Sequence, residues 1–74
     1  MISEHDQVVL IRDLPEEGLV AGDIATVIAV HQGGAGYTLE FTSLQGETVA
    51  IVTVHAQDVR AANKGDMPHV RAAE

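Results

Sequence analysis

The chain has 74 residues, no cysteine and a formal net charge of −7, from eleven Asp and Glu against four Lys and Arg. This length allows one small domain, and without disulfides its stability must come from apolar packing or self-association. The acidic balance argues against a nucleic-acid partner, because binding to phosphate backbones needs clustered Lys and Arg. No segment has the length and apolarity of a signal peptide or a membrane span, so we expect a cytoplasmic protein with no membrane contact.

Residues 8–11, Val-Val-Leu-Ile, form an apolar run with the length of one buried strand. Pro15 and Gly18 interrupt the stretch that follows, because proline lacks a backbone N–H and glycine marks a turn. The polypeptide therefore enters a long loop, which ends at the turn dipeptide Gly22-Asp23.

The most apolar stretch of the sequence follows this turn, and its β-branched residues predict a strand over residues 24–32. The glycine-rich residues 33–36 predict a flexible hairpin connection. The third strand has the clearest alternation in the sequence. Tyr37, Leu39 and Phe41 share one face, as a half-buried antiparallel strand requires.

A turn at residues 43–47 precedes a fourth strand at 48–54, which is β-branched almost throughout. Residues 55–58 resemble the single helical turn that often precedes the last strand of SH3-like barrels, which leaves residues 59–61 as a short fifth strand. Five short strands with near-regular turns predict an all-β fold, a small five-stranded SH3-like barrel over residues 1–61. An OB-like barrel is the main alternative, but it would need longer strands and usually a helix between the third and the fourth.

Beyond the fifth strand the sequence shows no hydrophobic periodicity. Residues 62–74 also carry too little apolar surface to order themselves. We therefore predict that they form a disordered C-terminal tail outside the barrel.

Several short motifs together resemble one known family. They are Val8-Val9-Leu10, Asp13-Leu14-Pro15-Glu16, Gly18-Leu19, Gly22-Asp23, Thr26-Val27, Tyr37-x-Leu39-Glu40-Phe41 and Gly46-Glu47-Thr48. This pattern is similar to a bacterial family of small proteins catalogued as domain of unknown function four-nine-two-six, over about residues 5–61. The resemblance implies an SH3-like barrel without an assigned activity, and it transfers no catalytic residue.

The loop after the first strand carries four carboxylates, those of Asp13, Glu16, Glu17 and Asp23. SH3-like barrels often present a binding loop at this place, so the four residues are candidates for recognising a basic or Arg-bearing partner. The simpler interpretation is a solvated acidic loop that keeps a small domain soluble.

The second and fourth strands are apolar on both faces, whereas a small barrel buries only one face of each strand. Some of these side chains must therefore change sides at a bulge or stay outside. An outward strip with Ile28, Val49 and Ile51 would be a contact surface for a second copy or a larger protein. Strand coiling, which buries residues of alternating phase in a curved barrel, is the competing interpretation.

No pattern indicates catalysis, a metal or a cofactor. His5, His31, His55 and His69 match no compact ligand spacing, although His31 and His55 end the second and fourth strands and could meet at one end of the barrel. We expect surface histidines. The glycine-rich segment 33–36 precedes a strand and has no nearby lysine, so it is not a phosphate-binding loop.

The leading functional hypothesis is a non-enzymatic protein-interaction module that binds a protein partner, or itself, through the acidic loop, the aliphatic strip or both. The Gly22-Asp23 turn before Thr26-Val27 is also similar to the first turn of KOW-type domains, which implies an RNA- or ribosome-associated module as an alternative. Ala25 stands where those turns commonly carry glycine. A further alternative is an accessory or maturation subunit of a metalloenzyme, similar to the barrel of nitrile hydratase β subunits.

Overall fold

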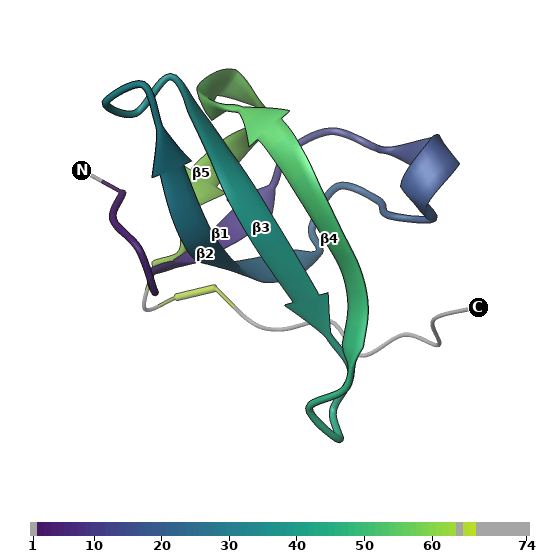
Figure 1. Cartoon of the computed structure of the whole chain (residues 1–74). Coiled ribbons are helices and arrows are strands. Elements are labelled where there is room, and N and C mark those ends of the chain that lie inside the picture. The colour runs from purple at the N-terminus through teal and green to yellow at the C-terminus, as the bar shows by residue number, and fades with distance from the viewer. Residues whose placement is uncertain (1, 64, 67–74) are drawn as a thin grey trace.

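The computed structural model describes residues 2–63, 65 and 66 (Figure 1). Within these residues it contains five strands and two single-turn 3-10 helices, and no helix is long and apolar enough to cross a membrane. The elements are β1 (Gln7–Leu10), η1 (Pro15–Glu17), β2 (Ile24–His31), β3 (Gly36–Thr42), β4 (Thr48–His55), η2 (Ala56–Asp58) and β5 (Val59–Ala61). The predicted all-β fold is confirmed, and each predicted strand lies within a residue or two of the observed one.

The strands form one antiparallel sheet in the order β4-β3-β2-β1-β5. β2 pairs with β1 through residues 24–26 and with β3 through residues 26–31. The first part of this long strand therefore joins β1 and the second part joins β3. The sheet curls around β2 and brings β5 and η2 behind β3 (Figure 1). This strand order, with a helical turn immediately before the last strand, is that of an SH3-like barrel.

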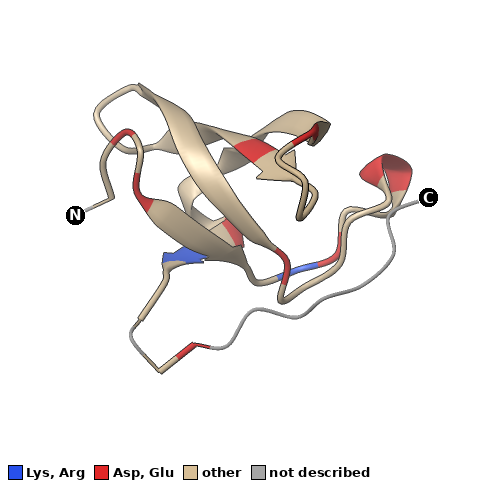
Figure 2. Ribbon diagram, turned by 90° about the horizontal axis from the view of Figure 1, so that it is seen from below, with Lys and Arg blue, Asp and Glu red and all other residues tan. Residues whose placement is uncertain are grey.

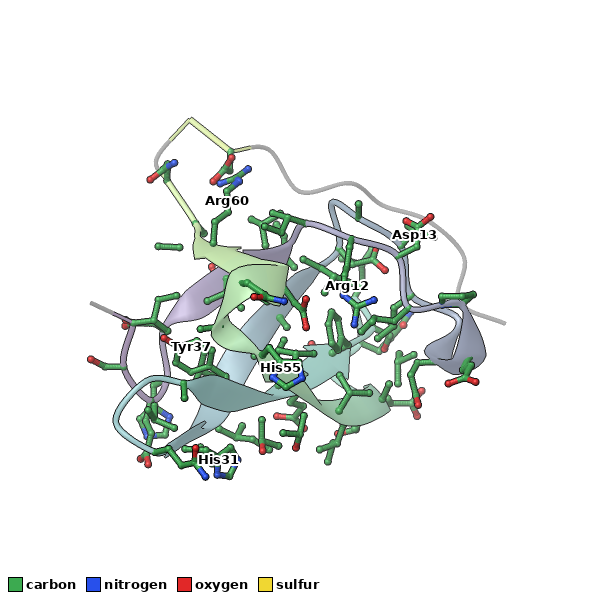
Figure 3. The ribbon with its side chains drawn as sticks, turned by 90° about the horizontal axis from the view of Figure 1, so that it is seen from above. Arg12, Asp13, His31, Tyr37, His55 and Arg60 are labelled. Carbon is green, nitrogen blue, oxygen red and sulfur yellow. The ribbon has the colours of Figure 1, made fainter. Side chains whose placement is uncertain are left out.

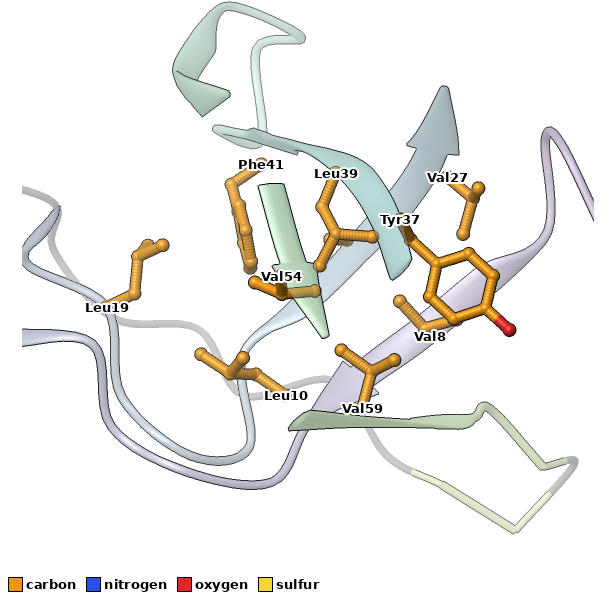
Figure 4. Close-up of a cluster of buried hydrophobic side chains, with 10 residues drawn as sticks. Val8, Leu10, Leu19, Val27, Tyr37, Leu39, Phe41, Val54 and Val59 are labelled. Atoms are coloured by element: carbon orange, nitrogen blue, oxygen red, sulfur yellow. The ribbon is translucent and has the colours of Figure 1, made fainter. Parts of the chain in front are cut away.

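The barrel core forms around the inward face of β3. Tyr37, Leu39 and Phe41 are buried there, as their alternation predicts, whereas Thr38 and Glu40 between them are only half-buried. The buried cluster consists of Val8, Leu10, Leu19, Ala25, Val27, Tyr37, Leu39, Phe41, Val54 and Val59 (Figure 4). Among the described residues no isoleucine belongs to this buried cluster, although Ile2 is partly buried and packs against it.

A β-bulge explains why β2 is apolar on both faces. The pairing with β3 shifts between Val27 and Ala29, so Val27 lies opposite Leu39 and Val30 lies opposite Tyr37. Valines three positions apart therefore both face the core, and Ile28 at the bulge is exposed. The extra residue that the bulge inserts into β2 therefore places Ile28 at the surface.

β4 reaches the same mixture by alternation over residues 50–54, and its pairing with β3 shifts between Ala50 and Thr48, so Val49 lies at a second irregularity of the sheet. Ala50, Val52 and Val54 pack on or in the core. Val49 and Ile51 lie on the other side and are 45% and 56% exposed. Both strands therefore carry outward apolar side chains, as expected from the sequence. They are Ile28 at the bulge of β2, and Val49 and Ile51 on β4.

Beyond β5 the backbone runs on along the sheet. The Ala62 N–H donates to the Gln7 carbonyl at 3.1 Å, and the Arg60 guanidinium donates to both carboxylate oxygens of Asp66 at 2.9 and 2.8 Å. Of the C-terminal tail predicted over residues 62–74, residues 64 and 67–74 lie outside the described part of the protein.

Candidate functional site

The β1–β2 loop is closed by its own backbone hydrogen bonds. Leu14 and Leu19 exchange N–H···O bonds of 2.9 and 3.1 Å, and the Leu19 side chain is buried in the core. At the far end of the loop the Gly22 N–H donates to the Leu10 carbonyl at 2.7 Å with a φ of 99°, which a side chain would disfavour. The loop is thus anchored to the barrel and presents η1 at its tip.

The four acidic residues of this loop have two different roles. The carboxylates of Asp13 and Asp23 accept hydrogen bonds from the backbone N–H groups of residues 21 and 20, at 2.9 and 3.0 Å, and so fold the loop. Glu16 and Glu17 belong to η1 and are exposed. Figure 2 shows this acidic turn projecting from the barrel. Of the four acidic loop residues predicted to bind a partner, only these two glutamates make no side-chain hydrogen bond with another described residue.

The aliphatic strip is split by β3. Glu40 of β3 pairs with Thr26 of β2 on one side and with Ile51 of β4 on the other. β3, with the polar side chain of Glu40, therefore lies between Ile28 and the exposed residues of β4. Glu40 also accepts a hydrogen bond from the Thr48 hydroxyl at 2.6 Å. Val49 and Ile51 remain together, and Ile28, 38% exposed, stands apart from them.

β4 is also an edge of the sheet, paired to β3 alone among the described strands. Its eight residues, Thr-Val-Ala-Ile-Val-Thr-Val-His, include no proline, lysine or acidic residue. Edge strands of soluble proteins are usually protected by such residues, because half of their backbone N–H and C=O groups are free to pair with another strand. The opposite edge, β5, has only three residues. β4 is therefore the long edge of this barrel, without a protecting side chain and with one irregularity in its pairing, at Val49.

A partly buried ion pair joins the start of the β1–β2 loop to η2 (Figure 3). Arg12 Nε donates to Asp58 Oδ1 at 2.7 Å, and the His55 backbone N–H donates to Asp58 Oδ2 at 3.1 Å. Asp58 is 4% exposed. Burial alone would raise its pKa, but the hydrogen bonds from Arg12 and His55 and their charges outweigh it, so the pKa lies below the ordinary 3.8.

The two strand-end histidines lie at the same end of the barrel, as expected, since His31 and His55 both pair with Gly36. His31 Nε2 lies 2.6 Å from the Thr38 hydroxyl, which in turn lies 2.9 Å from the Thr53 hydroxyl. This row of polar contacts crosses the exposed face of three strands. Within residues 2–63, 65 and 66, no group of three or more His, Cys, Asp and Glu side chains is arranged to hold a metal ion.

Residues 4–61 match the family model described as Domain of unknown function (DUF4926). The chain belongs to this family. The resemblance drawn from the sequence motifs is thus confirmed, and the matched range of this DUF4926 domain spans all five strands and the Arg12–Asp58 pair. Comparisons with curated proteins and with solved structures gave no match.

Two features of the DUF4926 domain were not found from the sequence. The Arg12–Asp58 pair joins residues 46 positions apart, so no local pattern reveals it. The second feature is that β4, a strand without protecting residues, lies at an edge, and this depends on the order of the strands in the folded sheet. A signal for the second feature was present, since residues 48–55 carry no Asp, Glu, Lys or Arg in a sequence with fifteen of them.

Proposed function

We propose that this DUF4926 protein is a non-enzymatic interaction module that associates with a second copy of itself through the outer edge of β4. The observation that carries the proposal is the combination of an eight-residue edge strand without protecting residues and two exposed β-branched side chains on it, Val49 and Ile51. Antiparallel pairing of two β4 strands would satisfy the free backbone groups and join the two sheets into one.

Pairing of one strand with its own copy has a twofold axis, so each contact occurs twice. Cross-strand pairs of β-branched side chains contribute roughly 0.2–1 kcal/mol each, in addition to the backbone hydrogen bonds. Each copy carries a net charge of −7, which opposes association, but β4 itself contributes no carboxylate to the contact. The residues of the edge therefore add no charge of their own to this repulsion.

The charges of the described residues favour a protein contact over a nucleic-acid contact. Arg12 and Arg60 are the only Lys or Arg residues in the part of the protein that the structure describes, and each is in an ion pair with an aspartate. Phosphate-backbone binding needs several cations on one face. Glu16 and Glu17 leave the loop tip available to a basic partner, as a second contact of the same module.

Sedimentation velocity from micromolar to millimolar protein tests the proposal, with Ile51→Lys as the edge variant. Ile51 is exposed, so lysine fits the monomer, but it places a charge on the pairing edge. Leu44→Lys is the matched control, because Leu44 is 83% exposed and lies in the β3–β4 turn rather than on the edge.

We expect wild type and Leu44→Lys to form dimers with rising concentration and Ile51→Lys to stay monomeric. A wild-type protein that is monomeric at millimolar concentration would remove the proposal. So would an Ile51→Lys variant that dimerises like the control.

A further inference from the structure

The guanidinium of Arg12 is hydrogen-bonded through Nε, and its Nη1 and Nη2 groups are exposed to solvent. Its Nε donates to Asp58 Oδ1, whereas neither Nη1 nor Nη2 makes a hydrogen bond with another described residue, and the side chain is 57% exposed. A guanidinium has five N–H donors in a rigid plane, and the two Nη groups form an edge that matches the two oxygens of a carboxylate. Arg12 therefore presents one such edge to solvent.

The other described arginine shows what this edge does when a carboxylate is present. Nη1 and Nη2 of Arg60 donate to the two oxygens of Asp66 at 2.9 and 2.8 Å. The Arg60 hydrogen bond is the main reason that the pKa of Asp66 is lowered to about 2. The Nη1/Nη2 edge of Arg60 is occupied by Asp66, and Arg12 offers the same edge without a carboxylate on it among the described residues.

Asp58 fixes the position of Arg12 in advance. The aspartate is held from two directions, because its Oδ2 accepts the His55 N–H and its own carbonyl accepts the Ile11 N–H at 2.9 Å. A long side chain that is already immobilised loses little conformational entropy when a ligand binds. In Figure 3 Arg12 lies between the η2 turn, which follows His55, and the start of the β1–β2 loop at Asp13.

We propose that Arg12 is a receptor for a carboxylate group, which docks on the Nη1/Nη2 edge between η2 and the β1–β2 loop. A guanidinium edge pairs in a bidentate way with either a carboxylate or a phosphate. A carboxylate carries one charge, so the carboxylates of Asp13, Glu16 and Glu17 in the same loop repel it less than a doubly charged phosphate, and for this reason we assign the site to a carboxylate. The carboxylate comes from the C-terminus of a bound protein or from one of its Asp or Glu side chains.

Arginine side-chain NMR spectra of the full-length protein, titrated with sodium acetate against sodium chloride at equal ionic strength, test this site. We expect a saturable shift of the Arg12 Nε–H signal in acetate alone, with Arg60 unchanged as the control inside the same molecule. Arg12→Lys sharpens the test, because lysine still pairs with Asp58 but lacks the planar edge. Followed in both proteins by the backbone amide signals beside residue 12, acetate should bind this variant about tenfold more weakly, the loss expected for one charge-assisted hydrogen bond.

Short peptides then distinguish the two sources of the carboxylate. One has a free C-terminus and no acidic side chain, the second is amidated with one Glu, and the third is amidated without any carboxylate. Binding of the first or the second, but not the third, supports the site and names its source.

Four results would overturn the proposal: equal shifts at Arg12 and Arg60, no saturation, unchanged acetate binding by a folded Arg12→Lys, or tighter binding of inorganic phosphate than of acetate. The site does not depend on association through β4. Acetate binding should therefore be the same in Ile51→Lys as in wild type, whichever way the sedimentation experiment turns out.

Discussion

At the scale of single residues, Asp58 is a buried charge that joins η2 to the start of the β1–β2 loop. A buried carboxylate is unfavourable unless charged and hydrogen-bonded partners compensate for lost hydration, and here Arg12 and the His55 N–H do so. Because the folded-state pKa lies below 3.8, the ionised aspartate contributes stability above that pH. This contribution is lost as the pH falls through the folded-state value.

Replacing Asp58 with asparagine should therefore destabilise the protein in a pH-dependent way. The neutral amide cannot form an ion pair with Arg12, and because Arg12 is partly solvated we expect a loss of about 1–3 kcal/mol at neutral pH. The difference from wild type should shrink below pH 3.8, as Asp58 itself becomes protonated. Urea unfolding followed by circular dichroism between pH 2 and 7 measures both effects.

Asp13→Asn is the control for that experiment. The Asp13 carboxylate is exposed and accepts one backbone hydrogen bond, which an asparagine oxygen is also able to accept. We expect a change within about 0.5 kcal/mol. A constant gap between Asp58→Asn and wild type at every pH would contradict the assigned role of the ionised carboxylate.

Gly36 is required for a different reason, the close approach of two strands. A Cβ at this position would lie 2.9 Å from the Val54 carbonyl oxygen of β4, and a backbone atom moves aside less easily than the end of a flexible side chain. Gly36→Ala should cost roughly 1–3 kcal/mol in the free energy of unfolding. Gly65→Ala, where no atom lies within 4 Å of the added Cβ, should be nearly neutral. Equal stability of the two variants in urea unfolding would contradict this prediction, because it would mean that the β4 backbone moves away from the added Cβ at little cost.

At the scale of elements, β3 determines the core. Leu39 is fully buried at its centre, so Leu39→Ala should destabilise by about 2–5 kcal/mol. A single small core supplies only about 3–5 kcal/mol, so this variant should be largely unfolded at room temperature. Leu44→Ala removes the same atoms from a side chain that is 83% exposed and should change stability by less than about 0.5 kcal/mol. Thermal melts of the two variants give the comparison. A Leu39→Ala variant as stable as Leu44→Ala would contradict the central role of Leu39 in the core.

β3 was also the element most fully predictable from sequence, because its period of two is uninterrupted from Tyr37 to Phe41. The burial of β2 was not predictable. The sequence shows valines and isoleucines at every phase, and only the pairing shift after Val27 decides that Val30 packs on the core and Ile28 does not. Bulges depend on the partner strand, which a single segment does not encode.

The candidate sites divide in the same way. Local chemistry identified the acidic loop, and the exposure of Val49 and Ile51 followed from excess apolar residues. The internal use of Asp13 and Asp23 depends on how the loop folds back. The Arg12–Asp58 pair requires the barrel to bring η2 beside the end of β1, so it appears only in three dimensions.

At the scale of the whole molecule, the net charge of −7 opposes the association that we propose for β4. Acidic segments lie on several sides of the barrel (Figure 2), so two copies repel each other even when an edge without carboxylates joins them. Salt shortens the range of this repulsion, from about 10 Å at 0.1 M to about 3 Å at 1 M. The apolar contacts and backbone hydrogen bonds of the edge are not screened in this way.

Dimerisation of the wild-type protein should therefore strengthen as sodium chloride is raised from 0.1 M to 1 M, and sedimentation equilibrium measures the dissociation constant at each step. Glu16→Gln with Glu17→Gln lowers the repulsion without touching β4, so this variant should dimerise more tightly at low salt and like wild type at high salt. Binding to nucleic acid has the opposite dependence, because released counterions make it weaker with salt. Association that weakens with salt would mean that charge attraction, rather than the β4 edge, brings the molecules together.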